Sequence, residues 1–136
     1  MHIRLYQCLT FLGILSLLLG FSLIAPAEQY WVAPADEAAK KNPVASNDSS
    51  IADGQKIYSK RCAACHGKTG NGDGPDAADL GIDPAKFSDA AIKNESDGAL
   101  FWKITVGKKP MPDYGRKLSP NERWNVVNYL RTLSRR

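Results

Sequence analysis

The chain has 136 residues, which is room for one small domain, and its 43% hydrophobic and 24% charged residues are typical of a globular protein. These values exclude a disordered chain and a membrane protein with several spanning segments. The net charge is +4 at pH 7, but no Lys/Arg run is interleaved with aromatic residues, so nucleic acid is not expected as a partner.

The first 27 residues have the pattern of an export signal. Arg4 supplies a positive charge, residues 8–24 carry no charge, and residues 25–27 form an A-x-A cleavage sequence. We therefore expect residues 1–27 to be a signal peptide, although the apolar run also approaches the minimum length of a retained membrane anchor. Either way the rest of the chain is expected in the periplasm or another extracytoplasmic compartment, with any membrane association running through residues 8–24.

Residues 28–49 contain prolines and a polar Ser/Asn/Asp tract, which predicts a linker or a strap that lies on the domain. A short helix is expected between Asp36 and Lys41. The remaining residues, 50–136, are expected to form the functional domain.

A first long helix is expected to begin after Ser50, because Ser50 and Asp53 resemble a capping box. Ile51, Gly54 and Tyr58 then recur at helical spacing. Glycine inside a helix costs about 1 kcal/mol relative to alanine. Gly54 therefore indicates a point where another backbone comes close.

Two further helices are expected after a glycine-rich loop at residues 67–84. One should span residues 97–106, with Ser96 as its cap and Gly107 as its end. The last should begin at Ser119, with Pro120 in the first turn and Glu122 closing a capping box. Its expected apolar face consists of Val126, Val127, Tyr129, Leu130 and Leu133. No strand pattern occurs, so the fold class is expected to be all-α, with three to four short helices and long loops.

Cys62-Ala63-Ala64-Cys65-His66 is a C-x-x-C-H motif, the pattern of covalent haem attachment. The two-residue spacer allows both thiols to form thioethers on one edge of a single porphyrin. His66 then lies under the ring, where its imidazole binds the iron. The motif predicts one haem c bound through Cys62 and Cys65, with His66 as a metal ligand.

Three other functions of a close cysteine pair are open at this point. A thioredoxin-like pair follows a strand in a βαβ unit, and no strand is visible in the sequence. A structural disulfide is feasible outside the cytoplasm, but it leaves the adjacent histidine without a role. Half of a zinc site lacks partners, because the third cysteine, Cys8, lies in the N-terminal segment.

Met111 is the expected second axial ligand, on a counting argument. Outside the N-terminal segment His66 is the one histidine and Met111 the one methionine, so bis-histidine ligation within one chain is ruled out. Met111 lies in a loop between Pro110 and Pro112, and thioether ligation raises the reduction potential of haem iron. The alternative is that Met111 is an apolar plug in its loop.

These residues together resemble the class I, cytochrome c-like family of bacterial monohaem proteins over about residues 50–134. The matching motifs are Gly54-x-x-x-Tyr58, Cys62-Ala63-Ala64-Cys65-His66, Gly72-Asp73-Gly74-Pro75, Gly107-Lys108-Lys109-Pro110-Met111-Pro112 and Val126-Val127-Asn128-Tyr129-Leu130. The resemblance implies a cytochrome c fold around one covalent haem. It also implies that the first and last long helices cross at right angles at Gly54, with Tyr58 and Tyr129 at the crossing.

The family also uses a proline carbonyl to accept a hydrogen bond from the haem-ligating imidazole, which fixes the ring and tunes its basicity. Pro75 matches that residue by its place in a Gly-Pro pair, and Pro84 is the alternative. The apolar side chains expected to line the haem are Leu80, Phe87, Leu100, Phe101, Trp102, Ile104 and Tyr114. Because the haem supplies much of the core volume, the chain without haem is expected to be largely unfolded.

The predicted function is that of a single-electron carrier in an exported respiratory or dehydrogenase chain, not of an enzyme. Its partners are expected to be redox proteins with acidic docking surfaces. The basic residues expected around the exposed haem edge are Lys60, Arg61, Lys68, Lys108, Lys109, Arg116 and Lys117. Two alternatives are an anchored cytochrome subunit of a larger oxidoreductase complex and a haem sensor or peroxidase with a labile sixth ligand.

Overall fold

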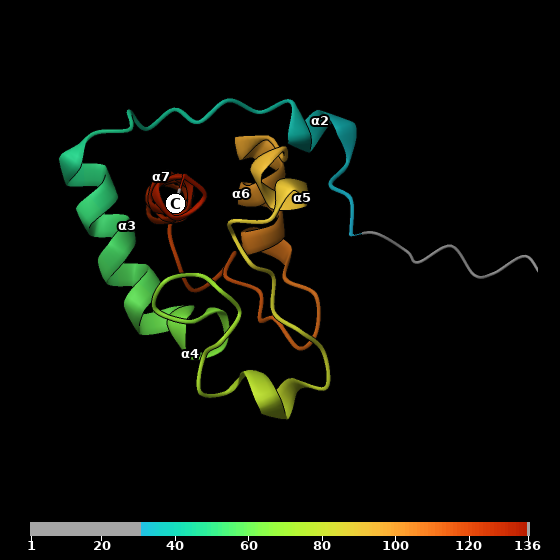
Figure 1. Cartoon of the computed structure of the whole chain (residues 1–136). Coiled ribbons are helices and arrows are strands. Elements are labelled where there is room, and N and C mark those ends of the chain that lie inside the picture. Colours follow the sequence, from blue (N-terminus) through green and yellow to red (C-terminus); the bar gives the residue numbers. More distant parts are fainter. Residues whose placement is uncertain (1–30, 136) are drawn as a thin grey trace, which may run out of the picture. The chain divides into compact units, whose positions relative to one another are not determined.

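The computed structural model describes residues 31–135, and helices dominate this part of the chain (Figure 1). The helices are α2 (Ala35–Ala38), α3 (Asp48–Arg61), α4 (Ala63–His66), η1 (Ala77–Leu80), α5 (Ala90–Lys93), α6 (Asp97–Val106) and α7 (Pro120–Leu133). Within residues 31–135 the β-type pairing is limited to one isolated bridge, so the expected all-α class is confirmed. Three helices are long, and the others have a single turn.

The signal peptide or anchor expected at residues 1–27 lies outside the described residues. Between residues 31 and 135 no helix combines the length and the apolar character that a membrane span requires.

The start of α7 is built as expected. The Ser119 hydroxyl accepts the amide of Glu122 at 3.3 Å, and the Glu122 carboxylate accepts the amide of Ser119 at 2.7 Å. Pro120 lies in the first turn, where its missing N–H leaves no helical bond unmade. The expected cap of α6 is confirmed as well, because the Ser96 hydroxyl accepts the Ala99 amide at 3.1 Å.

The start of α3 differs from the expectation. Asn47 is its N-cap, and its side chain accepts the amide of Ser50 at 2.9 Å. Ser50 therefore closes the capping box instead of opening it, and its hydroxyl accepts the Asn47 amide at 3.1 Å. The physical reason is that Ser50 is buried and its hydroxyl also donates to the carbonyl of Ala45 at 2.8 Å, in the segment before the helix.

Helices α3 and α7 cross at Gly54, as the resemblance implies. A Cβ atom on Gly54 would lie 2.0 Å from the carbonyl oxygen of Asn125, so a side chain cannot fit at this point. The rings of Tyr58 and Tyr129 pack beside the crossing, with centroids 5.2 Å apart. Figure 1 looks down α7 while α3 runs across the view, which shows the transverse arrangement.

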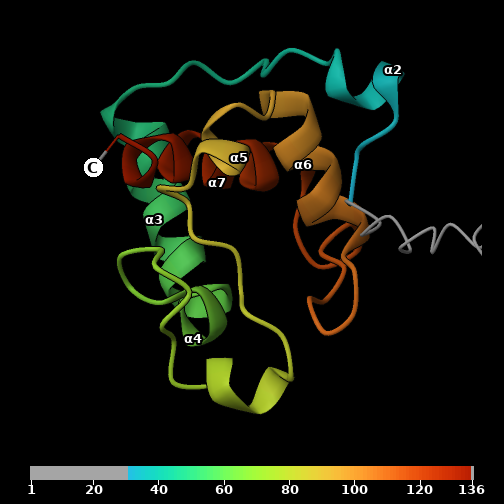
Figure 2. The ribbon, with the colours of Figure 1, turned by 45° about the vertical axis from the view of Figure 1, so that its right-hand side comes forward.

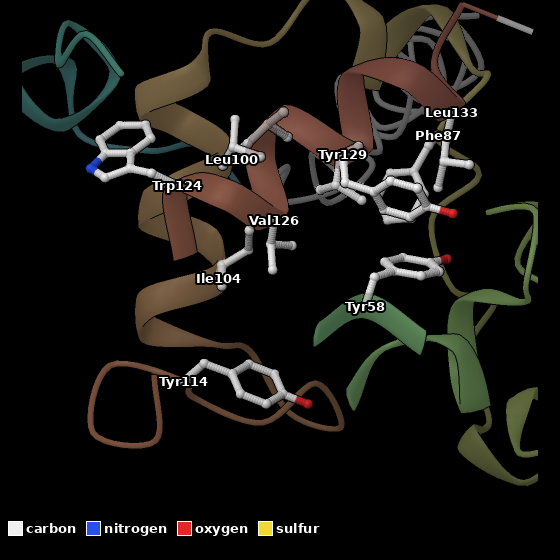
Figure 3. Packing of buried hydrophobic residues seen from close by; sticks show 11 residues of the cluster. Tyr58, Phe87, Leu100, Ile104, Tyr114, Trp124, Val126, Tyr129 and Leu133 are labelled. Carbon is white, nitrogen blue, oxygen red and sulfur yellow. The ribbon is translucent and has the colours of Figure 1, made fainter. Parts of the chain in front are cut away.

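The hydrophobic core is organised around α7, which supplies six of its eleven residues. Figure 3 shows how side chains from α3, α6 and the loops meet α7. The core residues are Tyr58, Phe87, Leu100, Ile104, Tyr114, Trp124, Val126, Val127, Tyr129, Leu130 and Leu133. Cys62 and Met111 are partly buried and pack against this same cluster, so the core extends to both sides of the predicted cofactor site.

Residues 32–47 form a strap on the helical domain. The Asn42 side chain donates to the Asn128 side chain of α7 at 2.8 Å, and the Ser96 hydroxyl donates to the carbonyl of Ala38 at 2.6 Å. At Gly98 in α6 a Cβ atom would lie 2.3 Å from a strap carbonyl, which shows how closely the two backbones approach. The described part of this segment therefore lies against α6 and α7.

Candidate cofactor site

The C-x-x-C-H motif lies at the junction of α3 and α4. The Cys62 amide still bonds Tyr58 as part of α3, while the Cys62 carbonyl accepts the amides of Cys65 at 3.2 Å and His66 at 2.9 Å. Both cysteines are free thiols and partly exposed. One helical turn thus places the two thiols and the imidazole next to one another, with the thiols accessible for covalent attachment.

The loop after the motif holds α4 by its main chain. The four carbonyls of residues 63–66 accept, in turn, the amides of Gly67, Asp76, Gly74 and Gly72 at 2.9 to 3.1 Å. A Cβ atom at Gly74 would lie 2.2 Å from the carbonyl oxygen of Ala64, so only glycine permits this contact. The sequence predicts a loop here. It does not predict that amides of the loop donate hydrogen bonds to every carbonyl of α4.

The His66 ring is oriented by a carbonyl and an aromatic ring. Its Nδ1 lies 3.1 Å from the carbonyl oxygen of Ala85, and its ring centroid is 5.0 Å from that of Phe87. Because a carbonyl only accepts, Nδ1 carries the proton, which leaves the lone pair of Nε2 for a metal. Burial lowers the pKa of His66, and the bond to Ala85 opposes that shift. The imidazole is therefore neutral at neutral pH, as a metal ligand must be.

The carbonyl that accepts this bond belongs neither to Pro75 nor to Pro84, which corrects the expectation. Pro75 lies between Gly74 and Asp76, whose amides bond α4, so its segment packs along the backbone of the motif helix. The Pro84 carbonyl points at Gly72, where it would lie 2.5 Å from an added Cβ. The acceptor is the next residue, Ala85.

Met111 lies in a tight turn between α6 and α7. Its amide donates to the Lys108 carbonyl at 2.8 Å, its carbonyl accepts the Lys108 amide at 3.1 Å, and the Lys109–Pro110 peptide bond within the turn is cis. The side chain is half-buried against the core cluster that Cys62 also contacts. In Figure 2 α4 and the loop that follows α6 extend on the same side of α7.

Tyr114 connects these two segments, a role that the sequence does not reveal. Its hydroxyl donates to the carbonyl of Arg61 at 2.8 Å, at the end of α3 and directly before Cys62. Burial raises the pKa of Tyr114, and the cysteine pair raises it further, so the hydroxyl keeps its proton. The sequence predicts Tyr114 only as an apolar residue beside the haem.

The thiols do not resemble a redox-active pair. Burial, and to a smaller extent the charge of Cys65, raises the pKa of Cys62 to about 12. A thioredoxin-like pair needs a cysteine with a lowered pKa instead. The βαβ unit in which such a pair lies is absent from residues 31–135. The arrangement therefore does not favour disulfide exchange.

The predicted lining and surface residues fall into two groups. Phe87, Leu100, Ile104 and Tyr114 are buried in the core, and the other predicted lining residues are partly buried; they are Leu80, Phe101 and Trp102. Whether each contacts haem stays a prediction. All seven predicted basic residues are exposed, namely Lys60, Arg61, Lys68, Lys108, Lys109, Arg116 and Lys117.

Comparison with known proteins gives a consistent family. The sequence model of the family described as Cytochrome c matches residues 51–134. The cytochrome c6 of Synechococcus sp. (strain ATCC 27167 / PCC 6312) is 30% identical over 90 residues, which cover 60% of this chain and 69% of that protein. The cytochrome c6 of Bumilleriopsis filiformis is 31% identical over 90 residues, which cover 63% of this chain and 94% of that protein.

Among solved structures, a chain of the Kuenenia stuttgartiensis reducing HAO-like protein complex superposes with a TM-score of 0.61 at 31% sequence identity. The match covers 67% of this chain and 46% of that chain, so the protein spans about half the length of this structural relative. A family match over most of the helical domain, around a C-x-x-C-H helix whose histidine is neutral, leads to one conclusion. The chain belongs to the cytochrome c family, among the class I monohaem c-type cytochromes, and its chemistry is haem-based electron transfer.

Proposed function

We propose that the protein is a single-electron carrier that holds one haem c through thioether bonds from Cys62 and Cys65, with His66 and Met111 as axial ligands. Bound haem supplies a reversible one-electron couple at its iron. The observation that carries the proposal is the bond from His66 Nδ1 to the Ala85 carbonyl, which leaves Nε2 as a free donor beside two free thiols.

The donor set fits haem c. The free thiols of Cys62 and Cys65 lie one helical turn apart, and the His66 imidazole is neutral. The half-buried Met111 packs against the hydrophobic core that Cys62 also contacts. The main chain of residues 67–76 fixes α4, and the Lys108–Met111 turn fixes the thioether. Ligands that are held this way change position little between the two redox states, which favours electron transfer.

The available side chains favour a carrier over a peroxidase. A peroxidase or gas sensor needs an open or labile sixth site and gains from an acid–base group beside it. Residues 31–135 contain a single histidine, and His66 is already committed to the iron in this proposal. No second imidazole in this part of the chain is available for proton transfer.

The exposed cations suit partners with acidic surfaces. Lys108 and Lys109 lie within the Met111 turn, and Arg61 directly precedes Cys62, so positive charge borders both sides of the proposed haem site. Such charges accelerate association at low salt and are screened at high salt. We infer an exported respiratory or dehydrogenase chain as the setting, with the protein periplasmic after removal of residues 1–27.

A second candidate is a cytochrome subunit of a larger oxidoreductase complex, anchored through residues 8–24. The observation in its favour is that the structural relative is a chain of the Kuenenia stuttgartiensis reducing HAO-like protein complex. The two candidates share the haem site and differ in assembly. Size-exclusion chromatography of the native protein distinguishes them, because a carrier elutes alone and a subunit elutes with its complex.

The test of the haem site is the absorption spectrum and mass of the purified protein from a host that attaches haem, compared with Met111→Ala. We expect the wild-type mass to exceed the polypeptide by one haem and the spectra to be low-spin with histidine and methionine ligands. Met111→Ala should retain covalent haem, lose the sulfur-to-iron absorption band, have a lower reduction potential and bind added ligands. A colourless protein, or a variant with an unchanged spectrum and potential, contradicts the proposal.

A further inference from the structure

The two sides of the proposed site come from separate segments of the chain. The thiols and His66 belong to the α3–α4 junction, and Met111 belongs to the loop that follows α6. The end of this loop is tied to α6, because the amides of Tyr114 and Gly115 donate to Ile104 at 3.1 Å and Thr105 at 3.0 Å. These bonds anchor the loop to α6, but they do not connect it to the motif helix.

The Tyr114 hydroxyl makes that connection, because the Arg61 carbonyl is free to accept it. In a continuous helix the Arg61 carbonyl would accept the amide of Cys65. The chain turns into α4 at Cys62, however, and the Cys65 amide bonds the Cys62 carbonyl instead. The Tyr114 hydroxyl fills the vacant position at 2.8 Å. Figure 3 shows Tyr114 below α6, with its hydroxyl pointing away from that helix.

We propose that the Tyr114 hydroxyl is a positioning group that holds the Met111 loop against the haem motif and so slows the exchange of the Met111 sulfur for other ligands. This inference rests on the proposed function, because it takes Met111 as the second axial ligand. The bond joins a residue three positions after Met111 to the residue directly before Cys62, and therefore links the two ends of the ligand set. Without it, the hydrogen bonds that run from the described loop to a neighbouring helix all go to α6.

The structure supplies a matched control in Tyr58. Its hydroxyl donates to the Gly67 carbonyl at 2.7 Å, and the side chain is also buried. Both ends of this bond lie on the His66 side, since Tyr58 is in α3 and Gly67 directly follows His66. Tyr58→Phe and Tyr114→Phe thus each remove a bond from a tyrosine hydroxyl to a main-chain carbonyl and keep the ring, but only Tyr114→Phe removes a link across the site.

The experiment adds imidazole to the ferric holoprotein and follows the loss of the sulfur-to-iron band. We expect Tyr114→Phe to exchange Met111 for imidazole about tenfold faster than wild type, which is the effect of one lost hydrogen bond. Tyr58→Phe should stay within about twofold of wild type in this rate, while losing as much global stability as Tyr114→Phe. A merely structural role of Tyr114 would produce the same exchange rate in both variants.

A second measurement covers the case in which Tyr114→Phe is less stable. On heating, the sulfur-to-iron band of this variant should disappear at a lower temperature than its helical circular dichroism, whereas in Tyr58→Phe both should disappear together. Wild-type exchange rates in Tyr114→Phe, or equal acceleration in both variants, overturn the inference and leave Met111 as a ligand. A wild-type protein that lacks the band overturns the proposed axial set and this inference with it.

Discussion

The two sides of the proposed haem site are held by different kinds of contact. On the His66 side, all four carbonyls of α4 accept main-chain amides of the next loop, and His66 itself donates to the main chain at Ala85. On the Met111 side, the loop pairs with itself between Lys108 and Met111 and reaches the motif through one side-chain hydroxyl, that of Tyr114. Main-chain bonds therefore hold the imidazole side to its motif, whereas a side chain joins the Met111 loop to that motif.

Because of this difference, the two sides tolerate different amino-acid substitutions. A main-chain bond persists when most side chains change, so the His66 side is sensitive where a new side chain blocks the approach of two backbones. A side-chain bond is lost in a single substitution, so the strength of the Met111 contact is adjustable while the fold is retained. The asymmetry suits the proposed carrier, in which covalent attachment and the imidazole are constant and Met111, as the proposed sixth ligand, tunes the potential.

The largest predicted effect comes from removing the covalent attachment of haem, on which both sides depend. Cys62→Ser combined with Cys65→Ser eliminates covalent attachment, and we expect this variant to lose most of its helical circular dichroism and its cooperative thermal transition. The reason is that a domain of this size buries too little apolar surface without the volume of the haem. Wild-type holoprotein, measured under the same conditions, is the reference. A haem-free variant with native helix content and a sharp transition would contradict the expectation.

The next largest effect breaks the His66 side alone. Gly74→Ala places a Cβ atom 2.2 Å from the Ala64 carbonyl oxygen, so the loop must detach from α4. We expect a loss of at least about 3 kcal/mol in the free energy of unfolding, measured by denaturant titration, and a reduced yield of holoprotein. The cost is steric and falls on the main chain, so no side-chain repacking relieves it.

Gly81 supplies the matched control for this prediction. Gly81 has φ +68°, and nothing lies within 4 Å of an added Cβ atom. Gly81→Ala should therefore cost only the conformational penalty of a positive φ, about 1 kcal/mol, and leave the holoprotein yield unchanged. Equal stability of the two alanine variants would show that the loop does not depend on its close approach to α4.

Much of the fold was predictable because its signals are local or steric. The caps at Ser96 and Ser119 lie within three residues of the amides that they accept. Gly54 lies inside a helix, where glycine is unfavourable, so its presence indicated the close approach of another backbone. The start of α3 was predicted incorrectly because Asn47 and Ser50 can both act as caps. The choice between them depends on the strap and on α7, which are distant in the sequence.

The second contact of His66 was not predictable from residue types. Every residue carries a carbonyl, so the identity of the acceptor depends on how residues 67–87 fold over the ring, and neither Pro75 nor Pro84 marks it. The Tyr114 bond was hidden for a similar reason, because its acceptor is a main-chain carbonyl 53 residues earlier in the sequence. The ligand types come from the sequence and stay a prediction, whereas the contacts that support them came from the tertiary structure.

The smallest predicted effect tests the end of the Met111 loop, where α7 begins. The Glu122 carboxylate accepts hydrogen bonds from the amide and from the hydroxyl of Ser119. Both bonds lower the pKa of Glu122, and the bond from the amide has the larger effect. Because the pKa is lower in the folded state than in the unfolded state, the carboxylate stabilises the fold above the ordinary glutamate pKa. This contribution disappears as the pH falls through the lowered value.

Glu122→Gln keeps a hydrogen-bond acceptor and removes the charge, so its stability deficit should be constant near neutral pH and should shrink in acid. Ser119→Ala removes the cap itself and should cost about 1 kcal/mol at neutral pH. Unfolding of both variants by denaturant across this pH range gives the comparison. If the Glu122→Gln deficit does not change with pH, the carboxylate charge does not stabilise the start of α7. The sulfur-to-iron band should be unchanged in both variants, since the Tyr114 bond holds Met111 independently of this cap.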